Sequence, residues 1–190
     1  MCGRYLSFAD SEIIAAQNML QFPSRSAFPL AQTEVFPSQT APILIIGGNS
    51  VVCTPGRWGF SRWDGKGVLI NARSETAHTT RVFAPYYTSC RCLIPAHGYF
   101  EWKKSGKTSE RYLFTGDGES GLFLAGLFRM EHDTAFAYVI LTRPAQPGCD
   151  EIHDRMPLIV PYDQINNWLY ARIDALALSD LTFPLTISPD

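Results

Sequence analysis

The sequence contains no long apolar run and no recognisable targeting segment. Its longest apolar stretches, such as residues 122–128, fall far below the roughly 20 residues that a membrane-spanning helix needs. The first residues include Arg4, Asp10 and Glu12, where a secretory signal would need an apolar core. We therefore expect a cytoplasmic protein that does not enter a membrane.

The five cysteines do not form an even set, and none belongs to a CxxC pair. This argues against a disulfide framework. Cys90 and Cys92 lie in an apolar run, with His78 and His97 not far away in the sequence, but their spacing is not that of a metal clamp. We expect no metal and no cofactor.

The chain has little net charge, −2 at pH 7, which by itself predicts no nucleic-acid partner. The charges are nevertheless unevenly distributed. Residues 1–110 hold eleven Lys and Arg against seven Asp and Glu, and residues 111–190 hold five against eleven. Twelve of the sixteen basic residues are Arg, the side chain that makes fixed phosphate contacts and stacks on bases. A basic face in the N-terminal half is therefore expected.

There are no repeats, no low-complexity segments and no linker, so residues 1–190 are expected to form a single domain. Turn signals separate many short strand-like runs, and only a few segments have helical periodicity. This pattern favours an α+β fold with a mixed, largely antiparallel, barrel-like β-sheet and a few peripheral helices. Helices are expected from Ser7 to Leu20, over 81–87 and over 163–171. A loop is expected over 22–40, with an extended piece at 34–36, and a hairpin from 42–46 and 51–53. Strands are expected over 91–95, 98–103, 111–115, 122–128, 136–142 and 156–160.

Cys2 becomes the first residue if Met1 is removed, which its small side chain should permit. An N-terminal cysteine carries an amine and a thiol on adjacent carbons, with unperturbed pKa values of about 8 and 8.5. The amine can condense with an aldehyde to an imine, and the thiol can then close a five-membered thiazolidine ring. The alternative is an ordinary buried cysteine.

Two further side chains could complete such a site. Asn71 ends an apolar run and could orient the amine of Cys2. Glu101 is flanked by aromatic residues, and burial there would raise its pKa and suit it to move protons. Taken singly, Asn71 could be a turn residue, and Glu101 could be a surface charge paired with Lys103.

His153 precedes an apolar strand and is the natural second acid or base. Alone, it could cap a connection together with Asp154. Combined with Cys2, Asn71 and Glu101, it completes a set of the kind that nucleophilic catalysis needs.

Seven segments carry a family resemblance: MCGRY at 1–5, RWGF at 57–60, INARSET at 70–76, RCLIPAHGYFEW at 91–102, AGLF at 125–128, VILT at 139–142 and IHDRMP at 152–157. In this order they resemble the successive blocks of the SRAP family, the SOS response-associated peptidases or abasic-site processing proteins. The resemblance covers about residues 1–160. It implies a mixed, barrel-like α+β fold.

The resemblance also implies a function in DNA damage. The family crosslinks abasic sites in single-stranded DNA through a thiazolidine between the mature N-terminal cysteine and the ring-opened sugar aldehyde. The matching catalytic set here is Cys2, Asn71, Glu101 and His153. We therefore expect a monomer that associates with the nucleoid when it is bound to damaged DNA.

The resemblance further assigns the DNA contacts, with Arg4, Arg73, Arg81 and Arg155 on phosphates and Trp63 and Trp102 against bases. Such a site needs an electrostatic groove and aromatic faces. For both tryptophans, a place in the core is the alternative.

Two departures from the family pattern are expected to affect DNA affinity rather than catalysis. The chain ends at Asp190, where relatives commonly continue, and the loop between Trp58 and Trp63 lacks the usual proline. Two other functions stay open. One is a cysteine peptidase or N-terminal-nucleophile hydrolase that removes its own Met1, and the other is a non-catalytic reader of single-stranded DNA.

Overall fold

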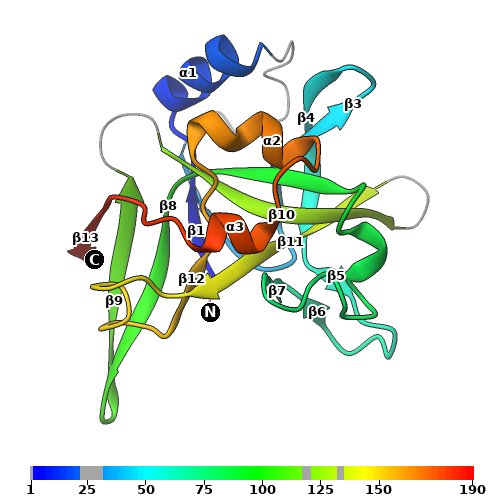
Figure 1. The fold of residues 1–190 in the computed structure, drawn as a ribbon. Coiled ribbons are helices and arrows are strands. Elements are labelled where there is room, and N and C mark those ends of the chain that lie inside the picture. The colour runs from blue at the N-terminus through cyan, green and yellow to red at the C-terminus, as the bar shows by residue number, and fades with distance from the viewer. Residues whose placement is uncertain (1, 22–31, 117–120, 132–134) are drawn as a thin grey trace.

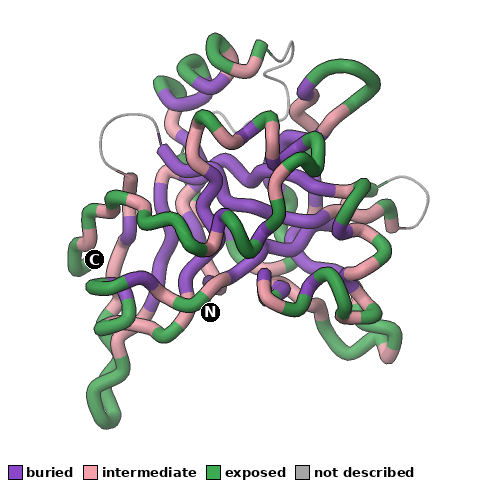
Figure 2. Tube along the Cα trace, in the orientation of Figure 1, coloured by how far each residue is buried: buried purple, intermediate pink, exposed green. Residues whose placement is uncertain are grey.

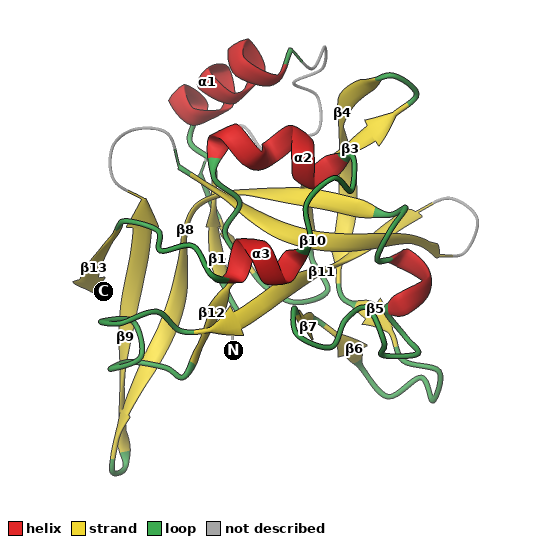
Figure 3. Cartoon of the chain, viewed as in Figure 1, coloured by secondary structure: helices red, strands yellow, loops and turns green. Residues whose placement is uncertain are grey.

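The computed structural model describes residues 2–21, 32–116, 121–131 and 135–190 (Figure 1). The first part of the loop that we expected over 22–40, residues 22–31, lies outside the described residues. Among the described residues, strands outnumber helices and form one large sheet of eleven strands with a small two-stranded sheet beside it (Figure 3).

Five long strands close into a ring. They are β3 (Thr40–Gly47), β4 (Ser50–Trp58), β8 (Arg91–Ser105), β10 (Leu122–Glu131) and β11 (Ala135–Pro144). The order around the ring is β10, β11, β4, β3 and β8, and β8 pairs back with β10. Only the pairing of β11 with β4 is parallel among these neighbours. The expected mixed, largely antiparallel, barrel-like sheet is confirmed.

Further strands extend this ring at its rim. They are β1 (Tyr5–Ser7), β2 (Glu34–Val35), β7 (Asn71–Arg73), β9 (Thr108–Gly116), β12 (Arg155–Pro157) and β13 (Leu185–Pro189), while β5 (Phe60–Ser61) and β6 (Val68–Leu69) form the small sheet. β1 and β9 flank the second half of β8, and β7 and β12 pair with the end of β11. The rim therefore brings the N-terminal residues, Asn71 and the chain around His153 to the same part of the barrel.

Helices α1 (Asp10–Leu20), α2 (Ile165–Leu169) and α3 (Ala175–Ser179) lie outside the sheet (Figure 1). At the start of α1, the carboxylate of Glu12 accepts a hydrogen bond from the main-chain N–H of Ala9 at 2.7 Å. Ile13 of α1 and Trp168 of α2 are fully buried against the sheet. The helices therefore cover one face of the strands, as expected for peripheral helices.

The strands alternate between two cores because neighbouring side chains of a strand point to opposite faces. On β8, Leu93 joins the core beneath the helices, whereas Cys92 and Ile94 join a second core that also holds Cys2 and Tyr5. The buried segments follow the strands of the barrel (Figure 2). The second core encloses the residue on which the predicted chemistry depends.

β8 is one strand of 15 residues, whereas the sequence predicted two strands over 91–95 and 98–103. Pro95 and Gly98 stand at the two ends of the gap between these predicted strands. In the structure, Pro95 keeps its place opposite Phe123, and Gly98 permits a close approach of β9, because a Cβ there would lie 2.4 Å from the carbonyl oxygen of Phe114. The partners of the strand change at this point, but the strand continues.

Other boundaries also differ from the predictions. The helix predicted over 163–171 is a 3-10 turn (Tyr162–Gln164) followed by the five-residue α2, and the one over 81–87 is a 3-10 turn at Ala84–Tyr86. The strand predicted over 156–160 pairs only as β12, with a single further bridge from Ile159 to Leu124. α1 begins at Asp10 rather than Ser7, because residues 5–7 pair as β1. α3 and β13 had no clear signal in the sequence.

Candidate functional site

Cys2 is fully buried in the second core. Its Sγ atom lies 3.7 Å from the main-chain carbonyl oxygen of Arg4. Burial raises the pKa of the Cys2 thiol, and the negative charge of Glu101 raises this pKa further. At neutral pH the resting side chain is therefore a thiol and not a thiolate.

Asn71 is the first residue of β7, and its side chain reaches Cys2. Its Nδ2 atom donates to the carbonyl oxygen of Cys2 at 2.8 Å. The preceding carbonyl, that of Ile70, accepts from the N–H of Ile140 and from Nε1 of Trp58, each at 3.0 Å. The Oδ1 atom of Asn71 is buried and has no hydrogen-bond partner in the described part of the chain. The amide therefore offers a free acceptor beside Cys2.

Glu101 lies on β8 and is only 3% exposed. Burial raises the pKa of its carboxyl group, and the positive charge of His153 opposes this rise. Because the Glu101 charge also acts on the Cys2 thiol, the three groups share one site. The alternative of a surface carboxylate paired with Lys103 is wrong, since the carboxyl group is buried.

His153 lies just before β12 and has two contacts at one ring nitrogen. Its Nδ1 atom is 2.9 Å from Oδ1 of Asp154 and 3.0 Å from the main-chain N of Arg155. A proton on Nδ1 can be donated to Asp154, and a bare Nδ1 can accept from the N–H of Arg155. With or without a proton on Nδ1, the ring therefore has a partner at this atom, which holds it in place as a candidate general acid or base.

Tyr99 is a member of the site that the sequence did not single out. Burial raises the pKa of its hydroxyl, and the charges of Cys149, Cys2 and Glu101 act in the same direction. Its ring stacks on Phe114 with the centroids 4.7 Å apart. The alternation of β8 could have revealed Tyr99, because residues 99 and 101 lie on the same face of the strand.

Arg155, one of the expected phosphate contacts, is held by Glu75. Its Nη1 lies 2.5 Å from Oε1 and its Nη2 lies 2.9 Å from Oε2 of Glu75, and Nη2 also donates to the carbonyl oxygen of Thr142 at 2.6 Å. The guanidinium lowers the pKa of the Glu75 carboxyl to about 2. This pair spans 80 positions in the sequence, so no local pattern could have predicted it.

Arg4 lies against the side chain of Trp102, which belongs to β8. The guanidinium carbon of Arg4 is 4.2 Å from the ring centroid of Phe36 and 5.3 Å from that of Trp102. Nη1 of Arg4 pairs with Oε2 of Glu34 at 3.3 Å. The structure therefore joins two of the expected DNA contacts in one cluster next to Cys2.

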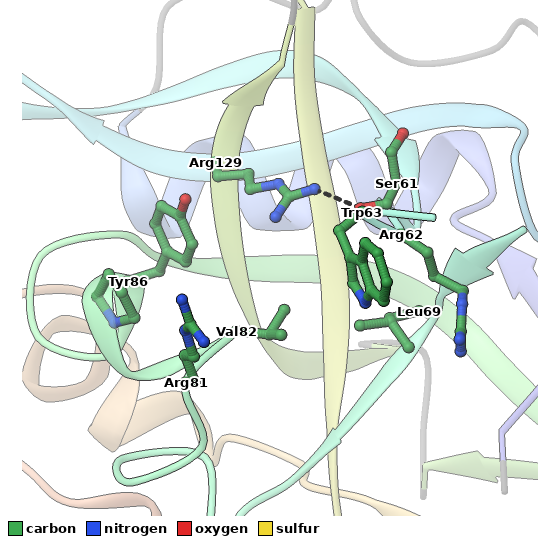
Figure 4. A pocket seen from close by; sticks show the side chains of 9 residues that line it. Ser61, Arg62, Trp63, Leu69, Arg81, Val82, Tyr86 and Arg129 are labelled. Atoms are coloured by element: carbon green, nitrogen blue, oxygen red, sulfur yellow. Dashed lines mark hydrogen bonds between the residues drawn. The ribbon is translucent and has the colours of Figure 1, made fainter. Parts of the chain in front are cut away.

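Arg73, Arg81 and Trp63 are exposed. Trp63 is 95% exposed, so its placement in the core is wrong, whereas Trp102 is half-buried. Trp63 and Arg81 line an open pocket of about 850 Å³. Figure 4 draws the side chains that line it. Its lining comprises Ser61, Arg62, Trp63, Leu69, Arg81, Val82, Pro85, Tyr86 and Arg129.

The structure thus brings Cys2, Asn71, Glu101 and His153 together at the rim of the barrel. Arg73 follows on the same short strand as Asn71, and the pocket lies around β5 and β6. In the part of the chain that the structure describes, no three His, Cys, Asp or Glu side chains gather as a metal site. No helix of that part is long and apolar enough to cross a membrane.

Comparison with known proteins adds sequence relatives. The sequence model of the family described as "SOS response associated peptidase (SRAP)" matches residues 1–187. The abasic site processing protein YedK of Escherichia coli K12 is 30% identical over 189 residues, which cover 95% of this chain and 85% of that protein. The abasic site processing protein YoqW of Bacillus subtilis is 31% identical over 181 residues, covering 89% and 80%.

Solved structures share the fold. A protein of Bordetella bronchiseptica superimposes with a TM-score of 0.79 at 23% identity and covers 100% of this chain and 99% of its own. A protein of Bacteroides thetaiotaomicron gives a TM-score of 0.80 at 21% identity, covering 99% and 91%. At this level of identity the likeness bears on the fold alone.

Proposed function

The chain belongs to the SRAP family, and from this premise we propose that it processes abasic sites by binding single-stranded DNA and forming a covalent thiazolidine through Cys2. The names of the relatives YedK and YoqW support a role in abasic-site processing. The covalent step rests on the chemistry of the residues around Cys2.

One observation carries the proposal. The side chain of Asn71 binds the main chain of Cys2 at 2.8 Å, and the charge of Glu101 acts on both Cys2 and His153. A nucleophile, an orienting amide and two proton-transfer groups therefore converge from four separate segments of the chain.

The reaction requires a free amine on Cys2, so Met1 must first be removed. The amine adds to the aldehyde of the ring-opened deoxyribose, and the loss of one water gives an imine. The sulfur then forms a bond to the imine carbon while the thiol proton passes to the nitrogen. The product is a thiazolidine ring, and the net change is the loss of one water.

The residues around Cys2 suit these steps. The buried Oδ1 of Asn71 can accept a hydrogen bond from the amine of Cys2. This bond would direct the lone pair of the amine nitrogen at the aldehyde carbon. The raised pKa of Glu101 suits it to exchange protons with the sugar and the thiol, and His153 can donate the proton that leaves with water. Because the thiol is not ionised at rest, the amine attacks first.

The single-stranded DNA is proposed to pass over exposed cationic and aromatic side chains. Arg73 lies two positions beyond Asn71 on β7, and Trp63 and Arg81 line the open pocket. Arginine supplies sequence-independent phosphate contacts, and an exposed indole supplies a face for stacking a base. Duplex DNA is expected to be a poorer substrate, because its sugar is reached only by unstacking.

A cysteine peptidase or N-terminal-nucleophile hydrolase is the second candidate, favoured by the description of the matched family. A peptidase nucleophile is normally a thiolate stabilised by an adjacent cation. Here Cys2 is buried beside a carboxylate, and both effects keep it protonated. This electrostatic setting supports chemistry that begins at the amine.

The proposal is tested by incubating the protein with a single-stranded oligonucleotide containing one abasic site and resolving the products on a denaturing gel. A heat-stable adduct with the mass of protein plus oligonucleotide minus one water, with Met1 absent, is expected. Cys2→Ala should form no adduct yet retain non-covalent binding, whereas Cys90→Ala should react like the wild type. An adduct that persists in Cys2→Ala would refute the assignment of the nucleophile.

A further inference from the structure

Two arginines from separate segments of the chain converge on one carboxylate. Arg4 precedes β1 and Arg111 belongs to β9, while Glu34 belongs to β2. Nη1 of Arg4 lies 3.3 Å from Oε2 of Glu34, and Nη1 of Arg111 lies 2.9 Å from Oε1. Each oxygen of the carboxylate therefore has its own guanidinium.

This arrangement matches the way in which arginines hold a phosphodiester. A backbone phosphate presents two non-bridging oxygens, and guanidinium groups bind such paired oxygens in a fixed geometry. The Glu34 carboxylate occupies the place of such an anion. We propose that Arg4 and Arg111 form a phosphate-binding site that Glu34 occupies until a phosphate of single-stranded DNA displaces it.

The two guanidiniums are held in place without Glu34. Arg4 lies against the rings of Phe36 and Trp102, and Arg111 lies over the ring of Phe100 with its carbon 4.5 Å from the centroid. Asp190, the residue after β13 (Leu185–Pro189), also pairs with Arg111. Departure of Glu34 would therefore leave a preformed site.

Glu34 is suited to leave. The three side chains of the cluster are each between 28% and 29% exposed, so both ion pairs are in contact with water rather than sealed in the interior. Nε of Arg4 is buried and has no hydrogen-bond partner among the described residues, so this guanidinium has a donor that Glu34 does not use.

The surroundings suit single-stranded DNA over a free anion. Phe36 is 38% exposed and Trp102 is half-buried, so aromatic faces lie directly beside the site. Bases stack on such faces irrespective of sequence. The site also adjoins the reactive centre, since the carbonyl oxygen of Arg4 lies 3.7 Å from Sγ of Cys2 and accepts from the N–H of Phe100.

This inference rests on the proposed function, and it adds Arg111 as a phosphate contact and Glu34 as a built-in competitor. The competition lowers affinity in proportion to the time for which Glu34 occupies the arginines. If it occupies them about nine-tenths of the time, its removal should tighten binding about tenfold. Undamaged DNA would be disfavoured by the same factor, provided that it needs this contact.

The experiment measures the binding of a short, undamaged, fluorescent single-stranded oligonucleotide by anisotropy over a series of salt concentrations. Glu34→Gln should bind more tightly than the wild type, by up to about tenfold. Arg111→Gln should bind more weakly, with a slope of log K against log salt that is about 0.7 shallower. The double variant should lose the gain of Glu34→Gln.

Two matched controls separate this site from a general effect of charge. Glu110→Gln removes an acid from the same strand as Arg111, but this carboxylate accepts from the hydroxyl of Tyr112, and it is in no ion pair with an arginine among the described residues. Arg172→Gln removes an arginine that lies over Tyr170, beyond α2. Both should bind almost as the wild type does. Equal tightening in Glu110→Gln and Glu34→Gln would overturn the proposal.

Folding and function are checked separately. Thermal unfolding of every variant should be cooperative, and Glu34→Ala provides a second test if the Gln variant does not fold. Wild-type protein that binds and crosslinks while Glu34→Gln and Glu34→Ala show no gain would overturn this inference and leave the proposed function standing. Wild-type protein that fails to bind single-stranded DNA would overturn both.

Discussion

The side-chain amide of Asn71 donates to the carbonyl oxygen of Cys2 at 2.8 Å, while its own oxygen is buried without a partner in the described part of the chain. One end of the amide thus fixes the main chain of Cys2, and the other end is available to its amine. The position of Asn71 at the start of β7 is therefore expected to set the orientation of the Cys2 amine.

Asn71→Ala should slow crosslinking about 10²-fold, since a small misplacement of a nucleophile has an effect of this size. Asn71→Asp keeps an acceptor but loses the donor, and it should fall between Ala and the wild type. Single-turnover rates on an abasic oligonucleotide measure both, with affinity for undamaged DNA as the control. A wild-type rate in Asn71→Ala would return this residue to a turn-forming role.

A non-removable residue placed before Cys2 should abolish the stable adduct. The change keeps the thiol but converts its neighbouring amine into an amide, which cannot form an imine. A thiol alone gives only a reversible hemithioacetal. Gel analysis after heating, together with intact mass, distinguishes these products. If the blocked protein crosslinks as stably as the wild type, the ring mechanism is excluded and the peptidase becomes the leading candidate.

Glu101→Gln should slow crosslinking by about 10²–10⁴-fold and yet stabilise the fold at neutral pH. Burial raises the folded-state pKa of Glu101 above its unfolded value. Stability is therefore lost as pH rises from the ordinary Glu pKa of 4.5 towards the folded-state pKa. Melting temperatures should differ at pH 7 and coincide below about pH 4. A less stable Gln variant at pH 7 would show that the fold favours the ionised carboxylate.

His153→Ala should slow crosslinking by at least about 10²-fold, as expected for a group that moves protons. Asp154→Asn offers a matched comparison, because it keeps the imidazole and removes a carboxylate that is 85% exposed. Exposed pairs contribute about 0–1 kcal/mol, so its rate should change by at most about fivefold. Equal losses in the two variants would mean that Asp154 has more than an electrostatic role.

Glu75→Gln should destabilise the protein at neutral pH, while Arg73→Ala should leave stability unchanged. The folded-state pKa of Glu75, about 2, lies below its ordinary value of 4.5. Its contribution is therefore present above about pH 4.5 and is lost as pH falls towards 2. Melting temperatures measured between pH 2 and 7 should show Glu75→Gln and the wild type becoming equally stable in acid.

Arg73→Ala is expected to weaken binding to single-stranded DNA. The slope of log K against log salt should be shallower by about 0.7 than in the wild type.

The sequence was informative wherever chemistry depends on residue type. An N-terminal cysteine, an amide, a carboxylate between aromatics and a histidine before a strand were each recognisable, and the structure places all four at one rim of the barrel. The roles assigned to them stay predictions. What local patterns could not predict are the contacts between distant segments, such as Glu75 with Arg155 and Glu34 with Arg111.

The errors in the predicted boundaries of strands and helices have a common physical cause. The sequence pattern shows local preferences, but it does not show which segments pack against each other in the fold. The sequence predicted a gap between the strands 91–95 and 98–103, but the backbone of β9 passes too close to Gly98 for a side chain there, and β8 runs on through the gap. The helix predicted over 163–171 is shorter because only Ile165, Trp168 and Leu169 pack against the sheet. Tertiary packing decided both boundaries.

The burial of Cys2 also affects the lifetime of the protein before it meets DNA. In the proposed reaction, a stable adduct consumes the molecule that forms it, so each copy would react only once. Peroxides attack the thiolate in particular, and a fully buried thiol with a raised pKa resists them. The protein would therefore keep its ability to react with DNA during oxidative stress, when lesions in DNA accumulate.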